Sequence, residues 1–393
     1  MQLVMTIGLA PLLITVFGSL SLVSPLANAL AVPFFTLVVV PLVLLGALAA
    51  TLSVSAGAVV LSAAAFLLEH CWGILQWMSE LPLAVVQLPA PTPLLQLALV
   101  CGAMLWVIPG IWPMKLFAAL LCLPALLKAP APPAHGEFFL AVLDVGQGLA
   151  SVIQTRSHVL VYDTGPAFRS GRDTGELVLL PFLRSRGIRQ IDLLIVSHDD
   201  LDHRGGVGSL LQGMPVRAIM LGPSVRTEGL RDLPLVRQLC RRGLGWSWDG
   251  VHFEMQHPAG LDFERDNDSS CVLRVATAGG SALLTGDIER LAEARLVADG
   301  LGPSDIVVVP HHGSRSSSTR GFVDALHARW AIVSAGYRNR WGMPRPDVMQ
   351  RWRDTGAQLL VTSEHGAIQF EVGTYGISAP LCHRNQHRHY WSR

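Results

Sequence analysis

The first third of the chain is almost free of charge, and this feature most restricts what the chain can fold into. Residues 1–136 contain two lysines, two glutamates and no arginine. Of the 30 basic and 29 acidic side chains in the whole sequence, 28 and 27 follow residue 136, as in an ordinary globular domain. The uneven distribution excludes a wholly water-soluble enzyme, a disordered chain, a coiled coil and a disulfide-rich scaffold.

Several apolar runs in this region have the length of a membrane-spanning helix, about 20 residues. A buried helical core is the alternative, which we disfavour because several runs lack a polar face. We predict spans at Leu3–Val23 and Ala31–Leu52, and a shorter one at Val54–Leu68. An interfacial helix is expected at Cys71–Val86, and two short spans or a broken pair at Leu94–Ile108 and Met114–Leu127.

The composition changes after a short stretch rich in proline and alanine, which we interpret as a stiff linker. We expect transmembrane helices over residues 1–128, the linker over 129–136, a folded domain over 137–376 and a basic tail over 377–393. The six cysteines are scattered and none forms a CxxC pair, so we predict buried apolar residues rather than bridges or zinc ligands.

Short β-rich runs alternate with helical stretches beyond the linker, which indicates a layered α/β domain. Strands are expected at 138–143, 150–154, 158–163, 193–197, 218–221, 251–256, 271–276, 281–285, 306–310, 331–334 and 358–362. Helices are expected at 177–186, 207–211, 234–241, 289–298, 319–326 and 347–355.

The strongest chemical signal directly follows one of these strands. His198, Asp200, Asp202 and His203 are four potential metal ligands within six residues. A loop at a strand end can direct such side chains toward two neighbouring ions, and imidazole with carboxylate suits Zn²⁺ or Mn²⁺. A solvated acidic turn is the alternative interpretation.

Two further strands end in side chains of the same kind. Asp287 follows the apolar pair Leu283–Leu284 closely, where it would bridge two ions or, alternatively, cap the next helix. His311 and His312 follow the next strand, and one of them would be a ligand. The Ser-rich loop after them, with Arg315, would donate to a phosphate, unless it is simply a polar loop. Ligands gathered at one sheet edge are what a two-metal hydrolase needs.

At these residues the sequence resembles the metallo-β-lactamase superfamily and, more narrowly, the ComEC family of bacterial competence proteins. The matching strings cover about residues 137–370: Asp144–Gly148, Asp163–Gly165, Ser197–Gly206, Asn267–Leu273, Leu284–Asp287 and Val309–Ser314. The hydrophobic third resembles the end of the family's membrane region. Nothing matches the family's N-terminal membrane segments or its oligonucleotide-binding domain, so we expect the C-terminal part of a longer protein.

The resemblance implies a transmembrane helical segment followed by an α/β metallo-β-lactamase-like αββα sandwich with two divalent metal ions, Mn or Zn. It implies a multi-pass protein of the bacterial inner membrane that acts in DNA uptake during natural transformation. The hydrolase domain would lie outside the cytoplasm and act as a nuclease on the strand that is not transported. Single- or double-stranded DNA, the membrane and other competence proteins would be its partners.

The resemblance also implies roles for individual residues. His198 and Asp200 would hold one metal ion, and Asp202 and His203 the second, unless Asp202 orients the attacking water. Asp287 would bridge, and His311 or His312 would complete the second site. Catalysis would depend on His198, Asp202 and Asp287. Supporting positions would be Asp144, Asp163, Asn267 and Asp268, the last two occupying the region where many superfamily members have a histidine ligand.

Basic and hydroxyl side chains near the last motifs are the candidates for contact with DNA phosphates, which need no sequence code. They are Ser314, Arg315, Arg338 and Arg345, with Arg320 and Arg340 beside them. An ordinary solvated surface is the alternative, because acids are nearly as numerous as bases.

One departure from the family concerns its Tyr-Gly-His-Pro stretch, which reads Trp341-Gly342-Met343-Pro344 here. Methionine cannot protonate a leaving group as imidazole can, and Arg345 or His312 would have to compensate. Two alternatives therefore stay open: a membrane-anchored hydrolase of a small molecule, and a DNA channel component with a vestigial metal site.

Overall fold

The computed structural model describes residues 2–81, 84–88, 91–127, 131–226, 236–260 and 266–386. It divides into two compact units, the first formed by residues 1–130 with the short stretch 184–187, and the second by the rest of the chain from residue 131 onward. Parts of two expected segments, residues 128–130 at the linker and 387–393 in the basic tail, lie outside the described residues.

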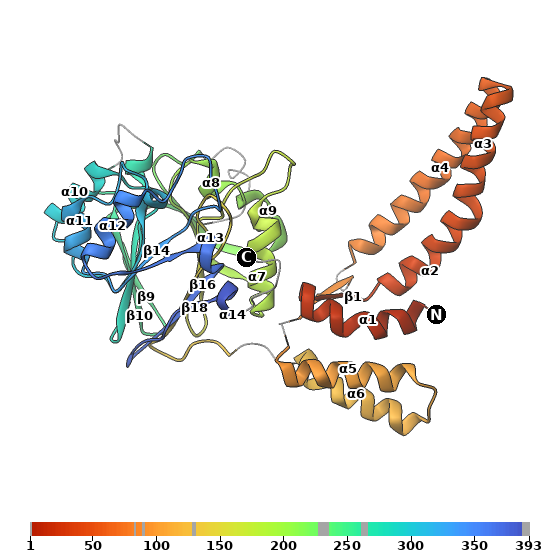
Figure 1. The fold of residues 1–393 in the computed structure, drawn as a ribbon, viewed down its shortest axis with the longest axis horizontal. Helices are drawn as coiled ribbons and strands as arrows, with labels where there is room; N and C mark the ends of the chain where they lie inside the picture. Colours follow the sequence, from red (N-terminus) through yellow and green to blue (C-terminus); the bar gives the residue numbers. More distant parts are fainter. Residues whose placement is uncertain are drawn as a thin grey trace. The chain divides into compact units, whose positions relative to one another are not determined.

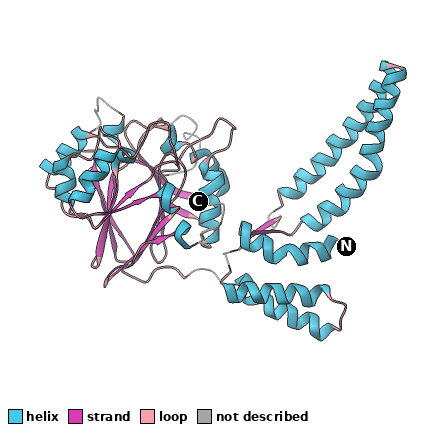
Figure 2. Cartoon of the chain, viewed as in Figure 1, coloured by secondary structure: helices cyan, strands magenta, loops and turns pink. Residues whose placement is uncertain are grey.

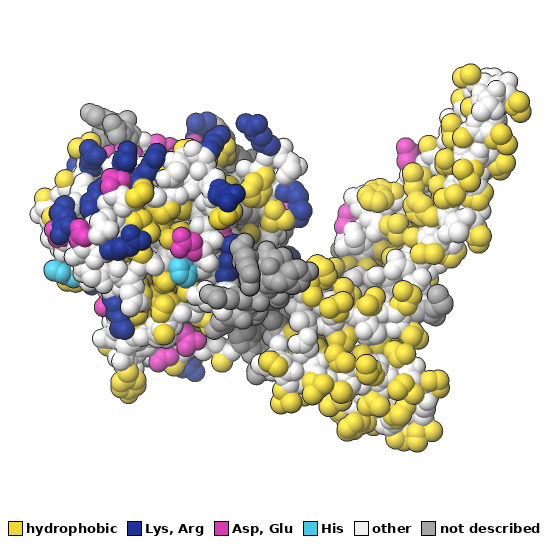
Figure 3. Space-filling model, viewed as in Figure 1, with side chains coloured by type: hydrophobic (Ala, Val, Ile, Leu, Met, Phe, Trp, Pro, Cys, Tyr) yellow, Lys and Arg dark blue, Asp and Glu magenta, His cyan; other side chains and the backbone are white. Residues whose placement is uncertain are grey.

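The first unit is helical, and its surface is covered by apolar side chains (Figures 1 and 3). Two of its helices are long and apolar enough to cross a membrane: the continuous helix Ser24–Leu52, and Val54–Ser79. The helices are α1 (Gln2–Phe17), α2 (Ser24–Phe34) with the π-helical turn Phe35–Val39, α3 (Val40–Leu52), α4 (Val54–Ser79), α5 (Pro93–Val107) and α6 (Trp112–Leu127). The strands β1 (Ser19–Ser21) and β2 (Val85–Gln87) pair antiparallel.

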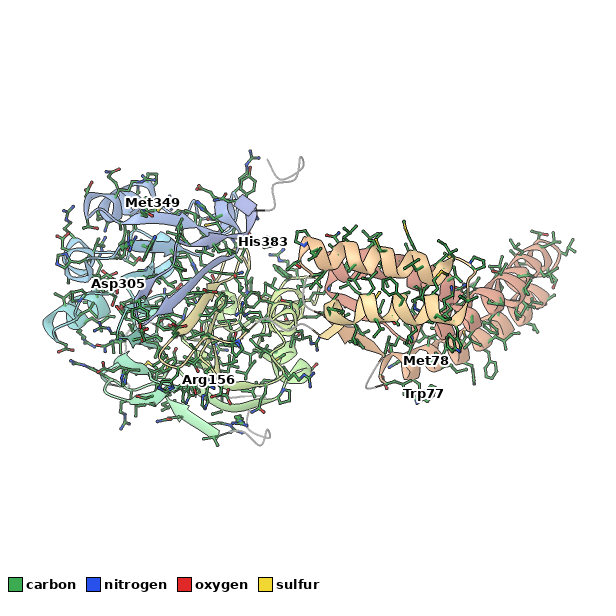
Figure 4. The ribbon with its side chains drawn as sticks, turned by 90° about the horizontal axis from the view of Figure 1, so that it is seen from below. Trp77, Met78, Arg156, Asp305, Met349 and His383 are labelled. Atoms are coloured by element: carbon green, nitrogen blue, oxygen red, sulfur yellow. A yellow bond between two sulfur atoms is a disulfide. The ribbon has the colours of Figure 1, made fainter. Side chains whose placement is uncertain are left out.

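Two sequence expectations for this unit are wrong. The predicted span Leu3–Val23 ends early, because Gly18 has φ +61° and stops α1 at Phe17. The predicted interfacial helix at Cys71–Val86 is not separate, because Glu69 and His70 do not interrupt α4, which ends at Ser79. Figure 4 labels Trp77 and Met78 near this end of α4, where Trp77 is exposed and Met78 is buried.

The α3–α4 hairpin is held by close approach of small residues. A Cβ on Gly57 would overlap the side chain of Ala50, and a Cβ on Gly46 would lie 2.8 Å from Leu61 Cγ. Small residues at these positions allow the two helix backbones to pack closely.

The second unit is built from two β-sheets packed face to face, with helices on both outer faces (Figures 1 and 2). The first sheet has the order β17-β16-β3-β4-β5-β6-β7-β8 with β18 beside β16. Its strands are β3 (Phe138–Val142), β4 (Ser151–Gln154), β5 (Val159–Tyr162), β6 (Ile191–Val196), β7 (Val216–Leu221), β8 (Val236–Leu239), β16 (Ile368–Gly373), β17 (Gly376–Ile377) and β18 (Leu381–Cys382).

The second sheet has the order β15-β14-β13-β12-β11-β10-β9. Its strands are β9 (Gly245–Trp248), β10 (Val251–His257), β11 (Val272–Thr277), β12 (Gly280–Leu284), β13 (Ile306–Val308), β14 (Trp330–Val333) and β15 (Gln358–Val361). The helices of the unit are α7 (Leu180–Ser185), α8 (Leu201–Arg204), α9 (Val207–Gly213), α10 (Arg290–Ala298), α11 (Arg320–Leu326), α12 (Pro346–Asp354), α13 (Thr362–His365) and α14 (His383–Gln386).

The alternation of side chains along the strands produces three cores. One face of each sheet packs against the other sheet, as with Leu140 and Leu273. The outer face of the first sheet carries α7 and α9, through residues such as Leu183 and Leu210. The outer face of the second sheet carries α10, α11 and α12, through Phe322 and Trp352 among others. The predicted αββα sandwich is confirmed.

Two expectations for this unit are also wrong. The helix predicted at 234–241 is replaced, in its described part, by β8, whose residues pair in parallel with β7 at the sheet edge. The cysteines are not all unpaired, because Cys240 and Cys271 form a disulfide with Cα atoms 5.7 Å apart. Cys240 follows β8 of the first sheet and Cys271 precedes β11 of the second, so the packing of the two sheets brings together residues 31 apart in the sequence.

Candidate metal centre

Three chain segments bring the candidate ligands to one edge of the sandwich. His198, Asp200, Asp202 and His203 lie in the loop after β6 and in the short helix α8, near the top of the sandwich in Figure 1. Asp287 follows β12, and His311 and His312 follow β13. Because β12 and β13 are parallel, their carboxyl ends meet at the same edge, and this edge faces the loop after β6.

Five of these side chains form two overlapping donor groups. The first consists of His198, His203 and Asp287, and the second of Asp202, His203 and His312. Within each group the ligand atoms all lie within 4.8 Å of one another. His203 belongs to both, with its Nε2 3.1 Å from Asp287 Oδ1 and 3.2 Å from His312 Nε2.

Hydrogen bonds on the far side of each ring orient the three histidines. His203 Nδ1 donates to Asp163 Oδ2 over 2.7 Å, and His312 Nδ1 donates to the Ser334 carbonyl over 2.7 Å. His198 Nδ1 donates to Ser197 Oγ over 2.9 Å. With the proton assigned to Nδ1, every Nε2 is directed into the centre, as partners of this kind do for metal-binding histidines.

Asp163 is the residue that joins two of these contacts. Its fully buried carboxylate accepts from the Ser197 N–H over 2.7 Å and from Ser197 Oγ over 2.8 Å, besides His203. It adopts φ +58°, and His311 and His312 also have positive φ, at 49° and 53°. Such left-handed conformations are uncommon outside glycine and cluster at functional sites.

The charges at the centre favour bound positive charge between the carboxylates. Burial alone would raise the pKa of Asp287, but the attraction of His203 and His312 holds it well below its usual range. Burial opposes the charge on His203 too, yet Asp287 and Asp163 raise the pKa of its imidazole well above the ordinary value. The pKa of His312 is raised as well, against its burial, by Asp287 and Asp202.

The donor set fits divalent cations. The buried Nε2 of His198 has no hydrogen-bond partner among the described residues, and the nearest carboxylate oxygen, on Asp200, is 3.5 Å away. Nε2 atoms of His203 and His312 face each other across 3.2 Å, which requires a proton or a cation beside them. Two groups of mixed imidazole and carboxylate donors match the ligand preferences of Zn²⁺ and Mn²⁺.

Two predicted ligands, Asp200 and His311, are not members of these two donor groups. Asp200 lies at the rim with a 52% exposed side chain, and its interaction with His198, whose Nε2 is 3.5 Å from Asp200 Oδ2, holds the pKa of its carboxyl below the usual value. His311 lies beside the donor groups, with Nδ1 3.2 Å from Glu289 Oε1 and Nε2 3.9 Å from Asp287 Oδ2. Of the two neighbouring histidines, His312 is therefore the one inside the donor groups.

Within the two donor groups, Asp202 has the most access to solvent, at 31% side-chain exposure. Its Oδ2 lies 3.4 Å from His312 Nε2. Partial burial would raise the pKa of the Asp202 carboxyl, but the hydrogen bond from His312 and the charge of His203 lower it overall. An ionised carboxylate therefore borders the centre on its open side.

The predicted supporting residues lie around the centre in different ways. Asp144 pairs with Arg384 over 2.7 Å, and Asn267 Nδ2 is 3.5 Å from His311 Nδ1. Asp268 Oδ1 accepts from the N–H of Glu289 over 2.9 Å, at the start of α10. The alternative that Asp287 caps this helix is wrong, because the carboxylate at the helix start belongs to Asp268.

The predicted phosphate-contacting residues are spread more widely. Ser314 Oγ is 3.0 Å from Ser316 Oγ, and Arg315 is exposed and paired with Asp347. The backbone of Arg345 donates to the carbonyl of Gly313, beside His312. Arg338 and Arg340 stack on Tyr337 and Trp341 in the exposed loop after β14. Arg320 is tied to Asp324 and Asp354 on the helical face instead.

Sequence reasoning missed several residues of this region. Ser197, Glu289 and Ser334 each orient a histidine, and Arg290 lies beside the centre, as described below. Glu289 offered a signal, since it follows Asp287 by two residues in the same strand-to-helix turn. Pro344, the residue after Met343, packs against Gly313, and Met343 Sδ is 3.9 Å from Gln147 Nε2.

Comparison with known proteins decides the family. The family model for the competence protein matches residues 1–113, and that for the metallo-beta-lactamase superfamily matches residues 143–336. The competence protein ComA of Neisseria gonorrhoeae is 36% identical over 379 residues, covering 96% of this chain and 52% of that protein. This chain belongs to the ComEC family of competence proteins.

Other ComEC-family relatives align in the same way. ComE operon protein 3 of Bacillus subtilis is 27% identical over 411 residues, which cover 96% of this chain and 53% of that protein. Recombination protein 2 of Haemophilus influenzae is 36% identical over 227 residues, 58% of this chain and 28% of that protein. The chain thus spans about half the length of the relatives that it matches end to end.

Solved structures resemble the second unit at low sequence identity. The metallo hydrolase Igni18 of Ignicoccus hospitalis superposes with a TM-score of 0.42 at 13% identity, covering 59% of this chain and 98% of its own. A diphosphatase of the PhnP family does so with a TM-score of 0.38 at 15% identity, covering 62% of this chain and 99% of its own.

Proposed function

We propose that this chain is the C-terminal part of an inner-membrane DNA-uptake protein whose second unit cleaves DNA phosphodiester bonds with two divalent metal ions. The observation that carries the proposal is the pair of donor groups that share His203. Membership of the competence family supports the role in DNA uptake, and the two long apolar helices support an anchor in the membrane.

In this proposal His198, His203 and Asp287 would hold one metal ion. Asp202 and His312 would hold the other together with the second oxygen of Asp287, because the single Nε2 lone pair of His203 can serve only one ion. Asp287 spans both groups, with one oxygen toward His203 and the other 3.4 Å from His312 Nε2. Two such cations supply an activated water and stabilise the charge that develops on a phosphoryl group. Asp202 lies on the open side, and its carboxylate oxygen that is not bound to metal would orient that water and accept its proton.

The Ser-rich loop would position the substrate. Ser314 and Arg315 directly follow the ligand segment, and their hydroxyl and guanidinium groups are donors to phosphate oxygens. Hydrogen bonds from the N–H groups of Ser318 and Thr319 to the buried carboxylate of Glu293 fix the far end of this loop. Contacts of this kind recognise any DNA, as uptake requires.

The disulfide between Cys240 and Cys271 supports a location of the second unit outside the cytoplasm. Disulfides persist in oxidising compartments and are rare in the reducing cytosol. Cys271 is fully buried and adjoins Ser270, whose Oγ accepts from the N–H of Asp287, so the bridge lies close to the metal centre. A thiol pair at this position would lose that covalent support in a reducing environment.

Cleavage of labelled DNA by the full chain in detergent, with added Mn²⁺, tests the proposal. We expect hydrolysis of single- or double-stranded DNA that disappears in Asp202→Ala and Asp287→Ala, while both variants keep the parental circular dichroism spectrum. Hydrolysis of lactams or thioesters without DNA cleavage would instead indicate a small-molecule hydrolase. A chain that retains no divalent metal by elemental analysis would contradict both enzymatic functions and leave a channel component with a vestigial site.

A further inference from the structure

A cavity of about 530 Å³ opens beside the metal centre, at the start of α10. Its size is within the range of small-molecule binding sites, about 300–1,000 Å³. The residues that line it come from three segments: Asp268, Glu289, Arg290, Leu291, Arg315 and Ser316.

One imidazole ring separates this cavity from the donor groups. His311 Nδ1 lies 3.2 Å from Glu289 Oε1 and 3.2 Å from Ser316 Oγ, both in the cavity wall. On the other side of the ring, His311 Nε2 is 3.9 Å from Asp287 Oδ2. The cavity therefore lies one side chain away from the donor groups.

The charges available to a ligand in this cavity are positive. The carboxylates of Asp268 and Glu289 are buried, and they accept from backbone N–H groups of α10 and contact His311, respectively. Arg290 is exposed, and no carboxylate among the described residues lies within 4.0 Å of its guanidinium. Arg315 is exposed beside it, with its Nε 3.1 Å from Asp347 Oδ1.

Arg290 is held in place before any ligand binds. Its Nη2 donates to the carbonyl of Arg315 over 3.0 Å, and its N–H donates to the carbonyl of Ser316 over 3.2 Å. The guanidinium thus has donors left for a phosphate at little further cost in side-chain entropy. Next to it, Leu291 is 58% exposed and offers an apolar surface to a sugar or base.

We infer that this cavity binds the nucleotide adjacent to the scissile bond, with its phosphate on Arg290 and Arg315 and its sugar or base on Leu291. The inference rests on the proposed function and names its substrate class: a polynucleotide rather than an isolated phosphodiester. Arg290 is then a residue that determines specificity and takes no part in bond cleavage.

Two substrates separate this role from a general effect on the metal centre. A 12-nucleotide single strand fills the cavity, whereas bis(p-nitrophenyl) phosphate has one phosphodiester and no neighbouring nucleotide. With the full chain and Mn²⁺, Arg290→Gln is expected to raise KM for the oligonucleotide about 10-fold or more, as for loss of a hydrogen bond to a charged group. Hydrolysis of bis(p-nitrophenyl) phosphate should stay within about twofold of the parent, and Arg290→Lys should lose less than Arg290→Gln.

Arg156→Gln is the matched control. Arg156, labelled in Figure 4, is an exposed arginine in the turn between β4 and β5. Because β5 is parallel to β6, this turn lies at the sheet edge opposite the metal centre. The control should change neither KM. The logarithm of the oligonucleotide's binding constant falls linearly with the logarithm of the salt concentration. The magnitude of this slope should decrease by about 0.7 in Arg290→Gln and not in the control, as for the loss of one single-strand phosphate contact.

Fluorescence anisotropy of the labelled oligonucleotide on metal-free chain measures binding independently of cleavage. If Arg290→Gln binds the oligonucleotide more weakly than the parent but the parent cleaves no DNA with Mn²⁺, the result would support nucleotide binding in the cavity and contradict the proposed function. Parental binding by Arg290→Gln, an equal loss on both substrates, or no binding by the parent at all would overturn the inference.

Discussion

Replacing Asp163 with asparagine tests whether hydrogen bonds outside the donor groups hold the centre together. The carboxylate of Asp163 accepts three hydrogen bonds, two from Ser197 and one from His203 Nδ1, each between 2.7 and 2.8 Å. An asparagine has one acceptor oxygen and one NH₂ group in the same space. Whichever way the amide is turned, its NH₂ group faces a group that donates.

The magnitude follows from that mismatch. If the amide oxygen stays on the Ser197 N–H, its NH₂ group faces the proton on His203 Nδ1. The imidazole then either keeps an unsatisfied buried donor, which costs about 1–3 kcal/mol, or moves its proton to Nε2, where metal binding needs the lone pair. We expect the metal affinity of Asp163→Asn to fall about 10–100-fold, the usual effect of losing such a partner.

Titration of Mn²⁺ into the metal-free full chain by isothermal calorimetry measures this loss. Asp192→Asn is the matched control, because Asp192 also accepts a backbone N–H, from Val159 over 2.9 Å, near the start of β6. The control should lose some stability and no metal affinity. A folded Asp163→Asn variant that binds Mn²⁺ like the parent would refute the reasoning.

Three further predictions follow from the structure. The pKa values of His203 and His312 are raised, so metal binding must displace protons from them, and the apparent Mn²⁺ affinity should increase from pH 6 to pH 8. The logarithm of the association constant should rise by about one per pH unit for each proton displaced. Competition with a chelator measures this affinity, and an affinity that does not change with pH would contradict the protonated state. The double change Cys240→Ser and Cys271→Ser should lower the free energy of urea unfolding of the second unit by about 3–4 kcal/mol, the loop-closure value for a separation of 31 residues, and a loss below about 1 kcal/mol would argue against a structural bridge. Gly57→Leu should destabilise the α3–α4 hairpin by about 1–3 kcal/mol, measured in thermal melts followed by circular dichroism in detergent. Gly73→Leu is the control and should not destabilise it, because a Cβ at Gly73 would have no atom within 4 Å. Equal melting temperatures of the two variants would be inconsistent with close packing at Gly57.

Much of the second unit was predictable because the sequence signals were local. Apolar runs ended by Gly, Asp or His marked β6, β12 and β13, and the side chains after these strands converge as the spacing suggested. The αββα architecture followed from the family resemblance. The assignment of Asp287 between two donor groups also agrees with its position at the end of β12.

The features that the sequence did not reveal depend on contacts between distant segments. The sequence predicted a helix over 234–241, whereas the strand conformation of β8 comes from parallel pairing with β7. The choice between His311 and His312 depends on which ring reaches His203, 109 residues away. The disulfide links two distant segments, and the cavity at Arg290 is lined by residues of three segments. No local sequence pattern indicates that these segments lie close together.

Anomalous X-ray scattering at the manganese edge, from crystals of the full chain grown with Mn²⁺, tests the central claim most directly. The account predicts two peaks, one beside His198, His203 and Asp287 and the other beside Asp202, Asp287 and His312. A map without anomalous density at these side chains, or with an ion bound only elsewhere, would contradict it.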